Sequence, residues 1–144
     1  MNQKEIFQTI TDNPVFHLAT IEGDQPRCRG MFLYKADEDG IVFHTGAFKD
    51  VYKQIDTNPK VELCFNDLQK AIQIRVSGKL EEIKDNDFKD EIYNHPTRQF
   101  LKKWRESGPL ENFYNEFKVY SLKNGKAVIW TMDTNFAPKE EIAL

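Results

Sequence analysis

The sequence predicts a mainly β (α+β) fold, an antiparallel barrel of about seven strands with short helices at its periphery. Two observations support this prediction. Stretches of alternating apolar and polar residues follow one another in hairpin order, and the helical patterns that interrupt them are short. Strands in that order close most easily as an antiparallel barrel. Since the 144 residues contain no repeat and no low-complexity linker, residues 1–144 are expected to form one domain.

A short amphipathic helix is expected at the start of the chain. Asn2 and Glu5 have the spacing of a capping box, in which each residue satisfies a backbone N–H of the other. Ile6 and Ile10 then fall on one helical face, and Asn13-Pro14 ends the pattern because the residue before a proline avoids the helical conformation.

The stretches that follow are expected to be strands. Asp39-Gly40 and Asn124-Gly125 are dipeptides typical of hairpin turns, so each is expected to join two neighbouring strands. Alternation is clearest at Val61, Leu63 and Phe65, which point to one face of their strand. The predicted strands are 15–21, 27–36, 41–45, 60–65, 71–83, 117–122 and 127–132.

Short helices are expected between some of these strands. In the first, apolar residues recur at i, i+3, i+4 and i+7, and Asn58-Pro59 ends the pattern. Pro96 divides the other two, and Ser107-Gly108-Pro109 closes the last of them. The predicted helices are 48–57, 85–93 and 97–105.

Composition excludes several classes of function. The chain has 20 Lys and Arg against 23 Asp and Glu, a net charge of −3, so a clustered positive face for nucleic acid is not expected. Cys28 and Cys64 stand alone, without a histidine at ligand spacing, so no metal site is predicted. No apolar run approaches the roughly 20 residues that cross a membrane, and residues 1–5 do not resemble a signal peptide. The protein is expected to be cytoplasmic.

The end of the third predicted strand is a candidate site for a phosphate group. His44-Thr45-Gly46 leads directly into the helix that carries Lys49 and Lys53. The first turn of a helix offers unpaired N–H groups and a positive dipole, which suit an anion when a lysine lies nearby. The alternative is that both lysines are solvated on the outer face of an amphipathic helix.

The second predicted strand brings two arginines to this region. Alternation puts Arg27 and Arg29 on one face and Cys28 on the other. If the second and third strands pair through the Asp39-Gly40 turn, Arg29 lies close to Thr45 and the start of the helix, where its guanidinium suits phosphate oxygens. The alternative is an exposed strand face with its arginines in water.

These motifs occur in a particular order along the chain. The stretches are FHLATI (16–21), QPRCRGM (25–31), IVFHTG (41–46), KDVYKQIDTNPKVEL (49–63) and QIRVSGK (73–79). The ordered set resembles the FMN-binding split barrels related to pyridoxamine 5'-phosphate oxidase, especially the nitroimidazole-reductase-like and general-stress-protein-like branches. The resemblance is close over residues 1–83 and loose over the rest of the chain. It implies a split antiparallel β-barrel that forms a homodimer with two FMN molecules at its interface.

The resemblance also implies roles for individual residues. The phosphate would be held by Arg29 and by Lys49, with Lys53 as the alternative lysine. The remaining flavin contacts would come from His44 and Thr45 along the ribityl chain, from the backbone of Gly30, Met31 and Phe32 beside the ring, and from Gln73 across the interface. Residues 133–144 do not match the substrate-binding region of true pyridoxamine-phosphate oxidases, which argues against pyridoxal phosphate synthesis.

His44 is the one candidate catalytic group, and two interpretations of it stay open. It is either a flavin-side histidine that transfers protons near neutral pH or a half-buried histidine satisfied by the backbone. The functional hypothesis is an FMN-dependent oxidoreductase that passes electrons from a reduced nicotinamide to a small acceptor such as a nitroaromatic, a quinone or another flavin. The alternatives are a non-catalytic flavin- or haem-binding stress or sensor module, and a small barrel that has lost its flavin.

Overall fold

The structure, a computed structural model, describes residues 1–144. Six antiparallel strands close into a barrel in the order β4-β1-β2-β3-β6-β5, with β5 pairing back onto β4, and β7 and β8 extend the sheet outward from β5. The predicted split antiparallel barrel is therefore confirmed, although the last long strand lies outside it. The strands are β1 (Val15–Glu22), β2 (Gln25–Asp37), β3 (Gly40–Gly46), β4 (Lys60–Asp67), β5 (Ile72–Ile83), β6 (Phe117–Leu122), β7 (Lys126–Trp130) and β8 (Ile142–Ala143).

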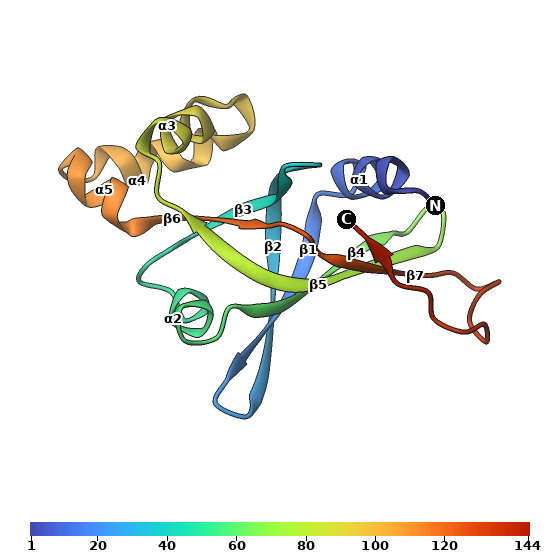
Figure 1. Ribbon diagram of the computed structural model, residues 1–144. Coiled ribbons are helices and arrows are strands. Elements are labelled where there is room, and N and C mark those ends of the chain that lie inside the picture. Colours follow the sequence, from blue (N-terminus) through green and yellow to red (C-terminus); the bar gives the residue numbers. More distant parts are fainter.

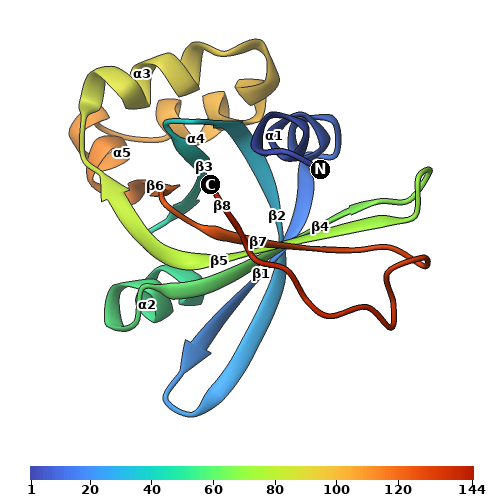
Figure 2. The same cartoon turned by 45° about the vertical axis from the view of Figure 1, so that its right-hand side comes forward.

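The helices lie around the barrel rather than within it. They are α1 (Gln3–Asp12), α2 (Asp50–Thr57), α3 (Asn86–Asn94), the 3-10 helix η1 (Pro96–Leu101), α4 (Lys102–Glu106) and α5 (Leu110–Glu116). Figures 1 and 2 show α3, α4 and α5 gathered on one side of the barrel, with α1 and α2 at separate positions. We call the chain from α3 to α5, residues 86–116, the helical segment.

The barrel core and the helical segment share strands β3 and β6. Ile41 and Phe43 of β3 belong to the barrel core, whereas Val42, between them, packs in a second cluster with residues of the helical segment. Both faces of β3 are therefore buried, which explains why its apolar run is continuous rather than alternating. His44, next on the outer face, is directed toward the helical segment by the same alternation.

The local signals at the start of the chain and at the Asp39-Gly40 turn are confirmed. The capping box forms, with the Asn2 side chain accepting from the Glu5 N–H at 2.9 Å and Glu5 accepting from the Asn2 N–H at 2.7 Å. Gly40 begins β3 with φ +134°, a conformation that favours glycine. The hairpin expected at Asn124-Gly125 is wrong: Asn124 lies in the left-handed region at φ 54° between β6 and β7, but these strands do not pair with each other, because β6 pairs with β3 and β5 whereas β7 pairs with β5 and β8.

The single regular helix expected at 97–105 is wrong. The chain instead makes η1 and then α4, and Arg98 departs from helical geometry with φ −114° and ψ 22°. The departure accompanies the entry of the Arg98 side chain into the interior, where it is 1% exposed. Two elements were not predicted at all: α5, which buries only Phe113, and β8, which has two residues.

No helix of the structure is both long enough and apolar enough to span a membrane.

Replacement of Phe16 by alanine should destabilise the fold strongly. Phe16 is fully buried, stacks on Phe65 with ring centroids 4.8 Å apart and meets Phe43 edge-on at 5.4 Å. We expect the free energy of unfolding to fall by about 3–5 kcal/mol, the usual cost of removing a core phenylalanine. Denaturant titration measures it. The matched control is Phe136→Ala, since Phe136 is 97% exposed and should change stability by about 0.5 kcal/mol or less. Equal effects of both variants would contradict the assigned core.

Candidate functional site

A cavity of about 610 Å³ lies between the barrel and the helical segment. Its volume is in the range of small-molecule and cofactor sites. No carboxylate is among the residues that line it, whereas an arginine and a lysine are. The lining residues are Arg29, Gly30, Met31, Phe32, His44, Thr45, Gly46, Phe48, Lys49, Val51, Phe100, Leu101 and Trp104.

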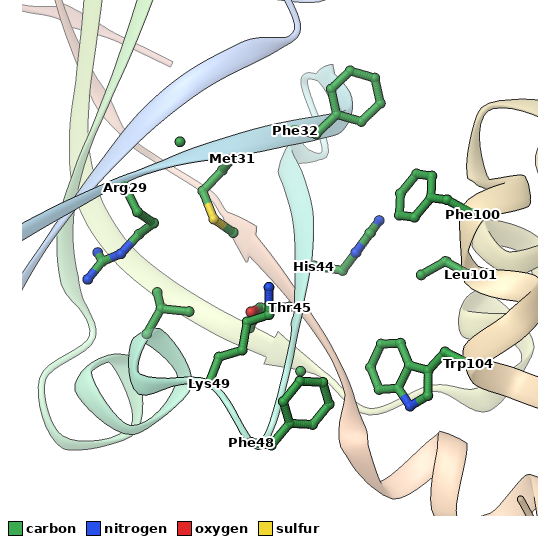
Figure 3. Close-up of a pocket in the computed structure, with 13 residues that line it drawn as sticks. Arg29, Met31, Phe32, His44, Thr45, Phe48, Lys49, Phe100, Leu101 and Trp104 are labelled. Atoms are coloured by element: carbon green, nitrogen blue, oxygen red, sulfur yellow. The ribbon is translucent and has the colours of Figure 1, made fainter. Parts of the chain in front are cut away.

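The two ends of the cavity differ in chemistry. Figure 3 shows Arg29 and Lys49 on one side and the aromatic and apolar side chains of the helical segment on the opposite side. Strand β2 supplies Arg29, the turn from β3 into α2 supplies Lys49, and η1 and α4 supply Phe100 and Trp104. We call the part of the cavity lined by Arg29 and Lys49 the basic end, and the part lined by Phe48, Phe100 and Trp104 the aromatic end. Such a cavity suits a ligand that carries an anion at one end and a flat ring at the other.

Arg29 is held in place by the barrel itself. Its Nη1 donates to the Leu18 carbonyl oxygen at 3.0 Å and to Thr20 Oγ1 at 2.7 Å, and its Nη2 donates to Gln54 Oε1 at 2.5 Å. Burial lowers the pKa of this guanidinium, which nevertheless keeps its charge. Of the five N–H groups that a guanidinium carries, Nε–H and one Nη2–H remain free for a ligand.

Sequence reasoning missed the two residues that orient Arg29. Thr20 is 2% exposed and Gln54 is 5% exposed, and the Thr20 hydroxyl donates to Gln54 Oε1 at 2.5 Å. Both had a recognisable signal. Thr20 continues the buried alternation of Phe16 and Leu18, and Gln54 stands on the apolar face of α2. A polar residue at a buried position needs a partner, and here the partner is Arg29.

The structure distinguishes the two candidate lysines. Lys49 lines the cavity in extended conformation just before the first residue of α2, with φ −91° and ψ 149°, and has no ion-pair partner. Lys53, one turn later, is exposed and lines neither this cavity nor the adjoining one. Position therefore favours Lys49 as the lysine that meets an anion, and the binding role itself stays a prediction.

A second cavity adjoins the basic end and differs from it in charge. It has a volume of about 510 Å³ and shares Arg29 and Lys49 with the first, but carboxylates of Glu22 and Asp50 also line it. Hydrogen bonds from Gln54, and then from Arg27, lower the pKa of Glu22, so this carboxyl group is ionised at neutral pH. An anion is therefore expected on the carboxylate-free side of Arg29.

His44 lines the cavity from the outer face of β3 and accepts a hydrogen bond from Arg98 of η1. Arg98 Nε donates to His44 Nε2 at 2.8 Å. Burial, with the positive charge of Arg98 as a second cause, lowers the pKa of His44 to about 3. The imidazole is therefore neutral near pH 7, which favours the second interpretation of His44, with an arginine side chain instead of the backbone as its partner. A catalytic role for His44 stays a prediction.

The other residues named from the sequence divide into two groups. Gly30, Met31, Phe32 and Thr45 all line the cavity, and a Cβ atom on Gly30 would meet nothing within 4 Å, so the backbone is bare there. Gln73 does not line it. Its side chain donates to Asn66 Oδ1 at 3.0 Å on the neighbouring strand β4, and its expected contact across a dimer interface stays a prediction.

Of the aromatic end, sequence reasoning singles out only Trp104, for which stacking on an aromatic substrate and packing in a core or interface both stay open, whereas Phe48 and Phe100 were missed. Phe48 and Phe100 are 62% and 61% exposed, and Trp104 lies between the cavity and the helical core with its ring edge-on to Phe48 at 5.5 Å. Nothing in the spacing of these residues reveals that they meet, because the helical segment must first fold onto β3. No group of three or more histidine, cysteine, aspartate or glutamate side chains is arranged to hold a metal ion.

The Thr20 hydroxyl should be required for the stability of the Arg29 site. Thr20→Val keeps the shape of the side chain but removes the hydroxyl that accepts from Arg29 and donates to Gln54, so we expect the free energy of unfolding to fall by about 1–3 kcal/mol. The control is Thr11→Val, because the Thr11 hydroxyl donates to an exposed carbonyl oxygen of its own helix. Its loss should lower the free energy of unfolding by about 0.5 kcal/mol or less. Thermal or urea denaturation compares the two. A Thr20→Val protein as stable as the parent would argue against this network.

Comparison with known proteins agrees with the geometry. The family model described as pyridoxamine 5'-phosphate oxidase matches residues 3–121. The pyridoxine/pyridoxamine 5'-phosphate oxidase of Brucella anthropi is 31% identical over 115 residues, 78% of this chain and 57% of that protein. The chain thus spans little more than half the length of this relative.

Solved structures share the fold over nearly the whole chain. A NimC/NimA family protein from Clostridium acetobutylicum has a TM-score of 0.76 at 25% identity, covering 98% of this chain and 92% of the other. General Stress Protein 26 from Bacillus anthracis has a TM-score of 0.70 at 20% identity, with 100% of each chain covered. A pyridoxamine 5'-phosphate oxidase-related, FMN-binding protein from Nostoc punctiforme has a TM-score of 0.63 at 14% identity, covering 99% and 96%.

These matches agree with the resemblance found in the sequence, including its two branches. Together with the barrel topology, they establish that the chain belongs to the pyridoxamine 5'-phosphate oxidase family of FMN-binding split barrels.

Proposed function

We propose that this protein binds FMN in the cavity and acts as an FMN-dependent oxidoreductase. The observation that carries the proposal is the cavity itself, with a carboxylate-free basic end and an aromatic end opposite. FMN has the matching form, a phosphate dianion joined by a flexible chain to a flat ring system. A ligand of this kind satisfies the free cations and covers the exposed aromatic surface at the same time.

The basic end would hold the phosphate. Arg29 contributes Nε–H and its remaining Nη2–H, Lys49 contributes a mobile ammonium group, and the backbone N–H groups at the start of α2 lie beside them. Thr45 lies between the two ends and provides a hydroxyl for the ribityl chain. Because Arg29 is already fixed by three hydrogen bonds, little side-chain entropy is lost when the anion binds.

The remainder of the cavity would hold the ring. The bare backbone at Gly30 allows a flat group to approach the strand closely, and the aromatic end offers rings for edge or face contact. FMN, when bound, supplies the redox chemistry of the site. The chain's own part is to fix the phosphate, orient the ring and shield one of its faces from water.

The electron donor and acceptor would meet the ring at the open side of the cavity. The sequence has no Gly-x-Gly-x-x-Gly fingerprint for a dinucleotide, so a reduced nicotinamide would bind transiently over the flavin rather than in a site of its own. We propose a small acceptor such as a nitroaromatic, a quinone or another flavin. We also propose a homodimer in which Gln73 of a second copy completes the site, because Phe48 and Phe100 leave the aromatic end largely exposed in one chain.

The phosphate contacts predict a specific pattern of affinities. Arg29→Ala should weaken FMN binding by about 1.5–3 kcal/mol, the usual value for a hydrogen bond to a charged group, but should change riboflavin binding much less because riboflavin lacks the phosphate. Lys49→Ala should behave in the same way, and Lys53→Ala, one turn further along the helix, is the matched control. Quenching of flavin fluorescence measures all these constants. Equal losses for both flavins would place Arg29 away from the phosphate.

The oxidoreductase and the binding module predict different spectra. The enzyme should purify with, or take up, FMN and show a flavin absorption band that NADH or NADPH bleaches under anaerobic conditions. Addition of a nitroaromatic or a quinone should then restore the band. Flavin that binds but is not reduced by either nicotinamide would favour the non-catalytic module, and a protein without affinity for FMN would contradict the proposal.

A further inference from the structure

Arg98 is a buried cation without a carboxylate partner. The residue is 1% exposed, yet its guanidinium forms no ion pair. Its partners are neutral: His44 Nε2 at 2.8 Å from Nε, the Leu33 carbonyl oxygen at 2.6 Å from Nη2, and Thr97 Oγ1 at 2.9 Å from Nη1. A buried charge without a counter-charge is costly. Its hydrogen bonds offset part of that cost, and one of them acts on a residue of the candidate site.

The hydrogen bond between Arg98 and His44 permits one form of the imidazole. An arginine Nε–H is always a donor, so His44 Nε2 must present its lone pair. A neutral imidazole carries a single proton, which therefore resides on Nδ1. Protonation of the His44 ring at Nε2 would place an N–H group against the Nε–H of Arg98. The hydrogen bond would then be lost, and two positive groups would face each other.

The other neighbours of His44 do not oppose this form. The rings of Phe117 and Phe100 lie with centroids 5.0 and 6.2 Å from the imidazole, so two sides of the ring contact apolar surface. The surrounding elements carry other charged and titratable groups. Tyr34 of β2 lies beyond the guanidinium of Arg98. Lys118 of β6 pairs with Glu82 of β5, and Lys102 and Lys103 of α4 are exposed. On the cavity side the charged groups are Arg29 and Lys49, both positive.

We propose that Arg98 is a positioning residue that holds His44 as a neutral imidazole with its proton on Nδ1. His44 Nδ1 makes no hydrogen bond within the chain, and His44 lines the cavity. The residue therefore offers a ligand a hydrogen-bond donor that is the same across the physiological pH range. This inference deepens the proposed function and depends on it only for the identity of the ligand.

The tautomer has a consequence for what binds beside His44. A ligand atom at this position must accept a hydrogen bond, as a carbonyl oxygen or an unprotonated ring nitrogen does, and a donor group there is disfavoured because it would leave two N–H groups facing each other. His44 then contributes orientation rather than a proton. The lowered pKa of its imidazole agrees with this role.

The kink at Arg98 shows how the chain makes this contact possible. A regular helix from Pro96 onward would carry the side chain along the helix surface, whereas the non-helical φ and ψ of Arg98 let it enter the interior between β2 and β3. Its guanidinium also lies over the ring of Phe32, with the central carbon 4.5 Å from the ring centroid. Strand β2, strand β3 and η1 are thereby joined through one side chain.

The first test uses the unmodified, flavin-free protein. Nitrogen-15 NMR of histidine-labelled protein reports which ring nitrogen carries the proton, and His44→Gln identifies the His44 signals. We expect Nδ1 to be protonated and Nε2 unprotonated, with no change between about pH 5 and pH 8, the range in which an unperturbed histidine titrates. A proton on Nε2, or a titration of His44 within this range, would overturn the proposal whether or not the protein binds FMN.

The second test separates the hydrogen bond from the charge. Arg98→Gln can retain an N–H donor to His44 without the charge, whereas Arg98→Met retains neither. In the methionine variant we expect the preference for a proton on Nδ1 to be lost and the pKa of His44 to rise, while burial, the larger cause of the lowered pKa, still keeps it below its ordinary value. We expect the FMN dissociation constant of this variant to rise by about 2- to 10-fold, which is the effect of one hydrogen bond. The glutamine variant should keep the Nδ1–H tautomer and bind FMN like the parent.

The outcomes distinguish the two proposals. A pH-invariant Nδ1–H tautomer in a protein that does not bind FMN supports the role of Arg98 and contradicts the proposed function. FMN binding to a protein whose His44 titrates between about pH 5 and pH 8 supports the proposed function and contradicts the role of Arg98. If Arg98→Met does not fold, as judged by circular dichroism, the NMR result for the unmodified protein still decides, because it requires no variant.

Discussion

The anchoring of the Arg29 guanidinium is the interaction on which the candidate site depends. A half-buried cation on a barrel strand is stable here because Leu18, Thr20 and Gln54 accept three of its hydrogen bonds from two other elements. These bonds orient the charge before any ligand arrives, and they exist only once β1, β2 and α2 have packed together. The site is therefore a consequence of barrel closure rather than of a flexible loop.

The helical segment turns this anchored charge into a cavity with two unlike ends. It packs on the outer face of β3 through its own apolar cluster and so brings Phe100 and Trp104 opposite the basic end. Arg98 of η1 enters the same interface and donates a hydrogen bond to His44. The barrel thus determines where an anion is held, and the helical segment determines what kind of surface surrounds the rest of the ligand.

Much of this architecture could be predicted because its signals are local. Alternation identified the barrel strands, the capping box identified α1, and the strand–glycine–helix turn identified Thr45 and Lys49 at the cavity. Lys53 shows the limit of such reasoning. It looks equivalent to Lys49 at helical spacing, but Lys49 precedes the first helical residue in extended conformation, so the two side chains do not share a helix face.

The remainder could not be predicted because it depends on contacts between distant segments. Arg98 lies 54 positions after His44, and a single arginine in a short helical pattern is most simply read as a solvated residue. Helix α5 escaped prediction because it has only 7 residues, of which Phe113 alone is buried. Thr20 and Gln54 carried a weak signal, since each is polar at an apolar position, but their partner became evident only from the packing of α2 on β1.

The position of a bound phosphate tests this account most directly. A crystal structure of the protein with FMN should place the phosphate within about 3 Å, hydrogen-bond distance, of the free N–H groups of Arg29 and near the ammonium of Lys49, with the ring directed toward Phe100 and Trp104. A phosphate that contacts neither cation, or a flavin bound elsewhere on the molecule, would contradict it.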